Sequence, residues 1–393
     1  AGPQTVNPWA TAINDGDPDV AQTLTFNVTN NTNPGLFSVG PAISATGVLT
    51  YTPAANANGG AMITLRVQDN GGTANGGVDI SPTQSFTITV NPVNDPPVAR
   101  TPAPSYTGNA NLTFTMLNDG GDGAGGILDL LDGATDPDGA TTIIVVAGTF
   151  ATANGGSVTV AANGSFTYLP PAGFVGSDTF GYQLLDDGIP GVATTNVTAT
   201  IALNDLDGAG ANTNVLWFID EDATSSTNSG TQANPFRTLA AFTAANAGSP
   251  QPVNEPDDTD FIFLDADATN ANGDGAGIYG GGITLRNNQR LIGDGSSSTL
   301  AAITGITLGS FNSLDAFSGT RPSIANAGGN GITLGSGNTL RGLNAGTTAA
   351  ANFSISGTAV GSLTISEALI TNATGGGVNV STSGALNVTL DSV

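Results

Sequence analysis

The sequence contains no cysteine, no histidine and no lysine, and only three of its 31 acidic residues are glutamate. Without histidine and cysteine the chain has no imidazole base, no thiol nucleophile and no ordinary site for zinc, copper, haem or an iron–sulfur cluster. Without lysine it can form neither a Schiff base nor a lysine–asparagine isopeptide cross-link. The absence of cysteine also argues against a disulfide scaffold.

Positive charge is scarce, and the formal net charge of the 393 residues is −24. This charge repels nucleic acid phosphates and anionic lipid headgroups, so we expect no nucleic acid partner. It attracts hard divalent cations, which prefer aspartate and asparagine oxygens. No 18-residue apolar run is present, so we expect no direct membrane insertion in this segment. The sequence starts without methionine and ends inside a strand pattern, which predicts a fragment of a longer polypeptide.

A composition rich in glycine, threonine, asparagine and valine is typical of an all-β protein with many turns. The stretches 49–69 and 166–186 align without a gap. Each has an Asp-Pro-Asp upstream and an Asn-Asp downstream, which predicts an internal repeat. The acidic marks are Asp17-Pro18-Asp19, Asp136-Pro137-Asp138, Asn94-Asp95 and Asn204-Asp205. We therefore predict two tandem immunoglobulin-like β-sandwiches, over residues 1–97 and 98–207.

From about residue 208 the pattern changes to short strands separated by glycine, asparagine and serine. The tetrad Gly-Ile-Thr-Leu begins at Gly282, Gly305 and Gly331, and we expect a strand at each copy. Strands this short can stack as coils of a parallel β-helix, which we predict over residues 208–393. A helix over 234–246, with Asn234 as its N-cap, is expected to cap the first coil.

Several motifs carry a resemblance to a known family. Residues 1–97 resemble the cadherin-like and related immunoglobulin-like repeats of giant bacterial surface proteins, and residues 98–207 look like the same superfamily. The third region is similar to right-handed β-helix regions of such adhesins. The motifs are Asp17-Pro18-Asp19, Leu49-Thr50-Tyr51-Thr52-Pro53 and Val93-Asn94-Asp95-Pro96-Pro97; Thr135-Asp136-Pro137-Asp138-Gly139 and Phe166-Thr167-Tyr168; and Asn234-Pro235-Phe236 and Gly281-Gly282-Ile283-Thr284-Leu285.

The resemblance implies calcium (Ca2+) at the joints between modules, where an affinity in the extracellular range of about 10⁻⁴–10⁻³ M would suffice. Asn94, Asp95, Asp136 and Asp138 would form the first site, with Asp69 as a further contributor. Asn204, Asp205, Asp207 and Asp186 would form a weaker second site, because no Asp-x-Asp follows it. Asp17 and Asp19 would need a module upstream. The alternative is that these aspartates are ordinary turn formers.

These observations predict an extracellular structural or adhesive surface protein, secreted or at the cell surface, and not an enzyme. Calcium would stiffen a multidomain fibre, and exposed sheet edges would let it associate into filaments. Expected partners are neighbouring copies, other surface proteins, or cell-surface and matrix glycans. The alternative is a secreted β-helix lyase or glycoside hydrolase using Asp265, Asp267 and Asp274 as acid and base. Those three aspartates could equally belong to a solvated loop or a second cation site.

The arginines of the third region and the two tryptophans could have either a binding role or a structural role. Arginines of the third region could grip acidic sugars or an acidic module, but we favour local ion pairs. Trp9 and Trp217 are expected in cores or caps, not on sugar-binding surfaces. The arginines are Arg237, Arg286, Arg290, Arg321 and Arg341.

Overall fold

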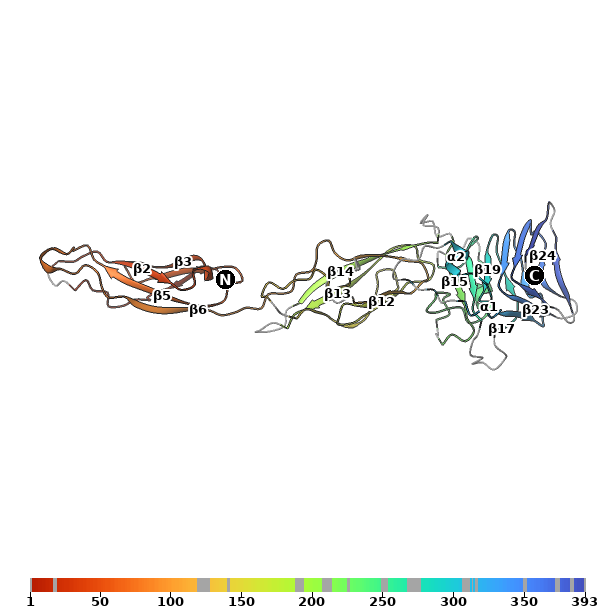
Figure 1. Ribbon diagram of the computed structural model, residues 1–393, viewed down its shortest axis with the longest axis horizontal. Coiled ribbons are helices and arrows are strands. Elements are labelled where there is room, and N and C mark those ends of the chain that lie inside the picture. Colours follow the sequence, from red (N-terminus) through yellow and green to blue (C-terminus); the bar gives the residue numbers. More distant parts are fainter. Residues whose placement is uncertain are drawn as a thin grey trace. The chain divides into compact units, whose positions relative to one another are not determined.

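The computed structural model divides the chain into two compact units (Figure 1). One comprises 1–98, 134–143 and 185–195, and the other 99–133, 144–184 and 196–393. The predicted three-domain division is finer than this and stays a prediction. The described residues are 2–16, 20–118, 128–139, 142–187, 194–206, 214–224, 227–248, 254–266, 277–305, 312, 314, 317–348, 352–371, 375–381 and 385–391.

The first module consists of two three-stranded antiparallel sheets, in the orders β1-β4-β3 and β2-β5-β6. Apolar residues at every second position of β5, Ala61, Ile63 and Leu65, are buried, as the period of a strand requires. Trp9 packs against this core, with its ring 4.5 Å from that of Phe86. The elements are β1 Gln4–Val6, β2 Thr25–Asn31, η1 Pro34–Leu36, β3 Phe37–Ile43, β4 Leu49–Pro53, β5 Gly59–Gln68, η2 Ala74–Gly76 and β6 Gln84–Val90.

The second module consists of two four-stranded sheets, in the orders β10-β11-β12-β8 and β7-β14-β13-β9. Its core is aromatic: the Phe166 ring lies 5.1 Å from Tyr106, 5.6 Å from Phe114 and 5.4 Å from Phe180. The strands are β7 Ser105–Asn109, β8 Phe114–Met116, β9 Ile144–Val145, β10 Gly148–Ala151, β11 Ser157–Val160, β12 Phe166–Leu169, β13 Gly176–Leu185 and β14 Thr194–Asn204.

Three parallel sheets follow, in the orders β15-β16-β19-β22-β25-β28, β17-β20-β23-β26 and β18-β21-β24-β27. From β17 onward the chain adds one strand to each sheet in turn and then repeats the cycle. The strands are β15 Leu216–Ile219, β16 Phe261–Leu264, β17 Ile278–Gly280, β18 Ile283–Thr284, β19 Arg290–Gly293, β20 Ser323–Asn326, β21 Ile332–Thr333, β22 Asn338–Arg341, β23 Asn344–Thr348, β24 Phe353–Gly357, β25 Ser362–Ser366, β26 Leu369–Ile370, β27 Gly376–Val380 and β28 Asn387–Asp391.

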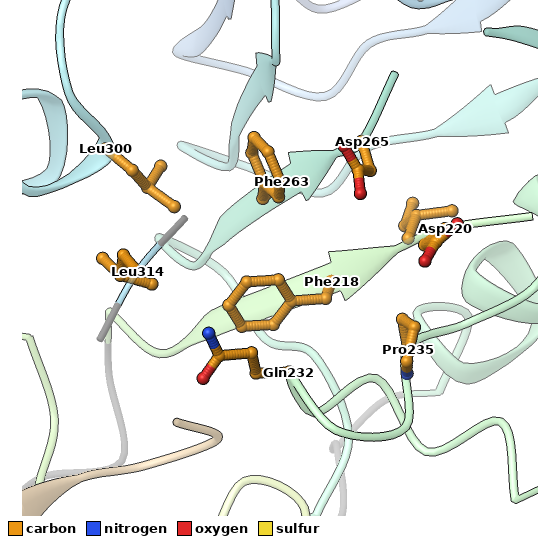
Figure 2. A pocket seen from close by; sticks show the side chains of 9 residues that line it. Phe218, Asp220, Gln232, Pro235, Phe263, Asp265, Leu300 and Leu314 are labelled. Atoms are coloured by element: carbon orange, nitrogen blue, oxygen red, sulfur yellow. The ribbon is translucent and has the colours of Figure 1, made fainter. Parts of the chain in front are cut away.

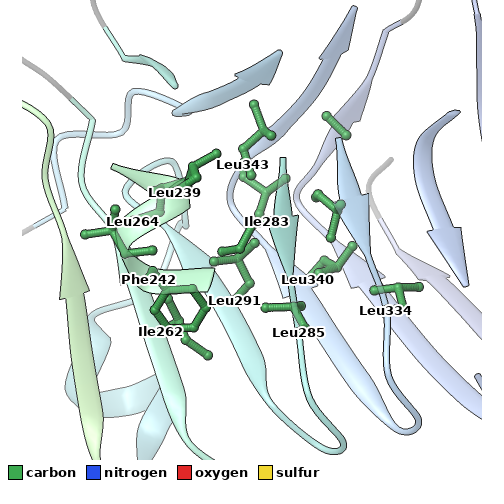
Figure 3. Close-up of a cluster of buried hydrophobic side chains, with 14 of the residues drawn as sticks. Leu239, Phe242, Ile262, Leu264, Ile283, Leu285, Leu291, Leu334, Leu340 and Leu343 are labelled. Carbon is green, nitrogen blue, oxygen red and sulfur yellow. The ribbon is translucent and has the colours of Figure 1, made fainter. Parts of the chain in front are cut away.

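Apolar side chains in register form columns between these sheets (Figure 3). Trp217, Ile262, Leu291, Leu340 and Ile365 occupy paired positions of successive strands and are each at most 1% exposed. Because parallel pairing aligns like positions, each strand buries the apolar side chain of its neighbour. The residues of this column belong to the main hydrophobic core of the third region.

The predicted capping helix starts later than expected. Helix α1 spans Leu239–Ala245, and its N-cap is Thr238, whose hydroxyl accepts a hydrogen bond from the Ala241 amide at 3.0 Å. The prediction that Asn234 caps it was wrong, because Phe236 is buried in an extended bridge with Ile219. Leu239 and Phe242 are the buried residues of this helix.

The repeated tetrad is confirmed as strand at two of its three copies. Ile283 and Ile332 pair directly, so β18 and β21 are neighbouring strands of one parallel sheet. The middle copy differs, because Gly305 is the left-handed C-cap of helix α2, Leu300–Thr304, with φ +75°. The rest of that copy, 306–308, lies outside the described residues.

Candidate cation site

The linker after β6 is held to the Asp-Pro-Asp turn by backbone pairing. Val98 and Thr135 form an antiparallel bridge, with N···O distances of 2.7 and 3.0 Å. The Thr195 hydroxyl donates to the carbonyl of Pro97. These residues all belong to the first unit. The pairing fixes the register between the two predicted acidic motifs.

Five predicted ligands come together there, and we call them the linker cluster: Asn94, Asp95, Asp136, Asp138 and Asp186. The Asp95 amide donates to Asp138 Oδ2 at 2.6 Å, and the Asn94 side-chain amide donates to Asp186 Oδ1 at 2.8 Å. Asp136 Oδ1 accepts from the Asp138 amide at 2.7 Å, which closes an Asx turn. The linker Asn-Asp and the Asp-x-Asp therefore meet as predicted.

The linker cluster brings four carboxylates together in a largely buried environment. Asp186 is 4% exposed, and the other members are half-buried. Asp136 Oδ2 is fully buried and makes no hydrogen bond within the described part of the chain. A buried carboxylate oxygen is costly unless a donor or a cation compensates it. All the side-chain oxygens here are the hard donors that calcium prefers.

The carboxylates alone do not enclose an ion. Within the described ranges, no three Asp, Glu, His or Cys side chains converge as a metal cage. A cation held here would therefore need amide or backbone oxygens as well. A pocket of about 250 Å³ beside Asp95 and Asp138 offers them, because Asn56, Asn58 and Asn91 also line it.

Two of the predicted assignments to joints were wrong. Asp69 follows the far end of β5, since Gly59, at the start of that strand, pairs with Val90 beside the linker. A ten-residue strand is roughly 33 Å long, so Asp69 cannot contribute to the linker cluster. Asp186 follows β13 in the same way, and the structure places it beside Asn94 instead of at the second joint.

Of the remaining predicted ligands, Asp17, Asp19 and Asp207 lie outside the described residues. Asn204 ends β14, and its carbonyl accepts from the Ala110 amide at 2.8 Å. Asp205 is 2% exposed.

Asn111 joins the second module to the first parallel strand. This residue is fully buried with φ +62°, and it donates to the Leu216 carbonyl at 3.0 Å and accepts from the Gly173 amide at 2.7 Å. A direct hydrogen-bonded contact therefore links the two parts at this joint, and the weaker cation site expected here stays a prediction. Sequence reasoning missed Asn111, whose only signal is that asparagine tolerates a left-handed conformation.

Apolar packing reinforces the same contact. Leu112 of the second module is fully buried against the outer face of the six-stranded sheet. Leu216, Phe218 and Phe261 project from that face into the cluster, and Leu300 of α2 covers it. The second module and the beginning of the parallel sheets therefore share one core.

Two of the five arginines form the local ion pairs that we favoured, and Trp217 lies in a core, as expected. Arg286 forms ion pairs with Asp257 and Asp258, at 3.4 and 2.9 Å, and Arg341 pairs with Glu367 at 2.6 Å. Trp217 is 1% exposed.

Comparisons with known proteins find similarities for the first two modules. Residues 94–205 match the bacterial cadherin-like domain, and residues 3–81 match a bacterial Ig domain. Domains of these kinds are typical of extracellular surface proteins, and cadherin-like domains generally bind calcium. No curated protein matches the chain. No helix among the described residues is long and apolar enough to cross a membrane.

Solved structures align with about half of the chain. Three repeats of mouse protocadherin-24 match at 14% identity and TM-score 0.30, covering 46% of this chain and 59% of that one. Two repeats of the human protein match at 17% identity and TM-score 0.29, covering 52% and 98%. An endo-fucoidan hydrolase of glycoside hydrolase family 107 matches at 20% identity and TM-score 0.19, covering 46% and 23%. The chain thus spans less than two thirds of the first and third of these structures.

Proposed function

We propose that the chain is an extracellular structural and adhesive surface protein whose first linker is stiffened by calcium. The observation that carries the proposal is the direct contact of Asn94 and Asp95 with Asp186 and Asp138. A cation among these oxygens would neutralise the repulsion between the carboxylates and fix the linker in one geometry. The match of residues 94–205 to a cadherin-like domain supports the choice of calcium.

In this proposal residues 208–393 form a right-handed parallel β-helix. Support comes from the three parallel sheets, which the chain visits in a repeating order, and from the columns of buried side chains between them. The β-helix and the sandwiches would together form a fibre. Exposed sheet edges would allow neighbouring copies or other surface proteins to add strands, and glycans are a second class of partner.

The role proposed is not catalytic. Of the three aspartates considered as acid and base, Asp265 lies within the described residues, and Asp267 and Asp274 lie outside them. Turnover of acidic polysaccharides that is lost on Asp265→Ala, with the fold intact, would contradict this part of the proposal.

Calcium titration tests the linker site. Chelator should lower the melting temperature of the 393-residue chain and broaden its small-angle scattering profile, and calcium should reverse both changes. Asp138→Asn should abolish the response because it removes a charged member of the linker cluster. Asp69→Asn is the matched control, since Asp69 lies at the far end of β5, and it should leave the response intact. Identical melting and scattering with and without chelator would refute the calcium joint.

A further inference from the structure

The outer face of the six-stranded sheet carries a pocket that plays no part in the proposed calcium joint (Figure 2). It lies over β15 and β16, which pair in parallel with Phe218 opposite Phe263. The two rings meet edge to face at a centroid distance of 6.0 Å. Leu300 and Leu314 complete the apolar wall. The enclosed volume is about 100 Å³, on the scale of one side chain.

Two carboxylates lie at the other end of this pocket. Asp220 and Asp265 each follow the aromatic residue of their own strand by two positions, and both line the pocket. The Asp265 amide donates to the Ile219 carbonyl at 3.0 Å, so the parallel register continues beyond the strands. Residues two apart share a face, so the carboxylates sit roughly 6–7 Å along the strands from the rings.

An apolar aromatic wall that ends at two carboxylates complements a long cationic side chain. The methylene stem can lie along the rings while the charged head reaches the carboxylates. An anion would be repelled, and a neutral apolar group would desolvate two charges without compensating them. The same face already shows this chemistry, because the Arg290 guanidinium lies 4.4 Å from the centre of the Phe261 ring.

We propose that this pocket binds an arginine side chain presented by a basic segment of a protein partner. The net charge of −24 attracts such a segment from a distance. The pocket then selects one guanidinium, since two adjacent carboxylates can accept its planar fork of donors. This interaction is independent of calcium at the linker cluster.

The test is an NMR titration of the 393-residue chain, labelled with ring-¹³C phenylalanine. The ligand is the peptide Gly-Ser-Arg-Ser-Gly, blocked at both ends. A second peptide carries citrulline, the neutral isostere of arginine. The arginine peptide should shift the Phe218 and Phe263 signals and bind at least about fivefold more tightly than the citrulline peptide. The separate variants Asp220→Asn and Asp265→Asn should each weaken arginine binding by about fivefold.

Asp222→Asn is the matched control: it removes the same charge two residues from Asp220 and outside the pocket. It should change the affinity less than about twofold. If all three variants lost the same affinity for the arginine peptide, general charge attraction would explain the binding and the proposal would be overturned. Equal binding of the two peptides to the unmodified chain, or unshifted ring signals, would also overturn it, whatever the stability of the variants.

Discussion

Replacing Asn111 should loosen the contact between the second module and the parallel sheets. Asn111→Ala leaves the Gly173 amide and the Leu216 carbonyl without the partner that the Asn111 side chain provides. Losing two buried hydrogen bonds costs about 2–4 kcal/mol. The backbone at φ +62° adds about 1 kcal/mol for alanine. The expected loss in the free energy of unfolding is therefore about 3–5 kcal/mol.

Asn111→Gly separates the two contributions, because glycine accepts the left-handed conformation but lacks the amide. Its free energy of unfolding should fall by about 2–4 kcal/mol, which is about 1 kcal/mol less than the loss in Asn111→Ala. Trp217 lies next to Leu216 and is 1% exposed, so its fluorescence reports the unfolding of this region. Urea unfolding in a Trp9→Phe background makes Trp217 the sole tryptophan signal.

Asn288→Gly is the matched control for that series. Asn288 is also left-handed, with φ +58°, but it is exposed. Its replacement should change the free energy of unfolding by no more than a few tenths of a kcal/mol. If Asn111→Gly were as mild as this control, the amide of Asn111 would not hold the contact and the reasoning would fail.

Three further predictions concern the parallel-sheet region. Burial raises the pKa of Asp260 to about 7, so the folded state binds this proton more tightly than the unfolded state, and stability should fall as pH rises from about 4 to 7. Asp260→Asn should remove this contribution to the pH dependence of stability. If the melting temperatures of the unmodified chain and of this variant differed by the same amount at every pH, the prediction would be contradicted. Leu300→Ala should cost about 2–4 kcal/mol, measured by urea unfolding, because Leu300 is 3% exposed in the shared core. Gly342→Ala should lower the melting temperature, because φ is +66° and a Cβ would meet Ser296; an unchanged temperature would show that the turn relaxes.

The longer and more apolar strands carry a clear signal in the sequence. Ser157–Val160 and Phe261–Leu264 each carry a run of β-branched or apolar side chains, which favours the strand that the structure has there. The strands of the sheet β17-β20-β23-β26 carry a weaker signal, because they are short and three of them contain glycine or asparagine. Pairing with neighbouring strands therefore decides their conformation.

The sequence indicates which residues belong to candidate cation sites more clearly than which of them lie together. The acidic motifs mark the ends of each module, which is why Asn94, Asp95 and Asp138 meet as predicted. A sequence does not state which end of a strand faces which joint, so Asp186 was assigned to the wrong one. Asn111 depends on Gly173 and Leu216, which are distant in sequence, and no local pattern carries that information.

The columns of buried side chains bear on how the chain is made. The strand with Trp217 leaves the ribosome before those with Leu291 and Leu340, and each later strand of the six-stranded sheet pairs with one already synthesised. Every new strand therefore meets a finished template on one side. Synthesis and folding of the parallel sheets can advance together, one strand at a time, without waiting for the distant end of the polypeptide.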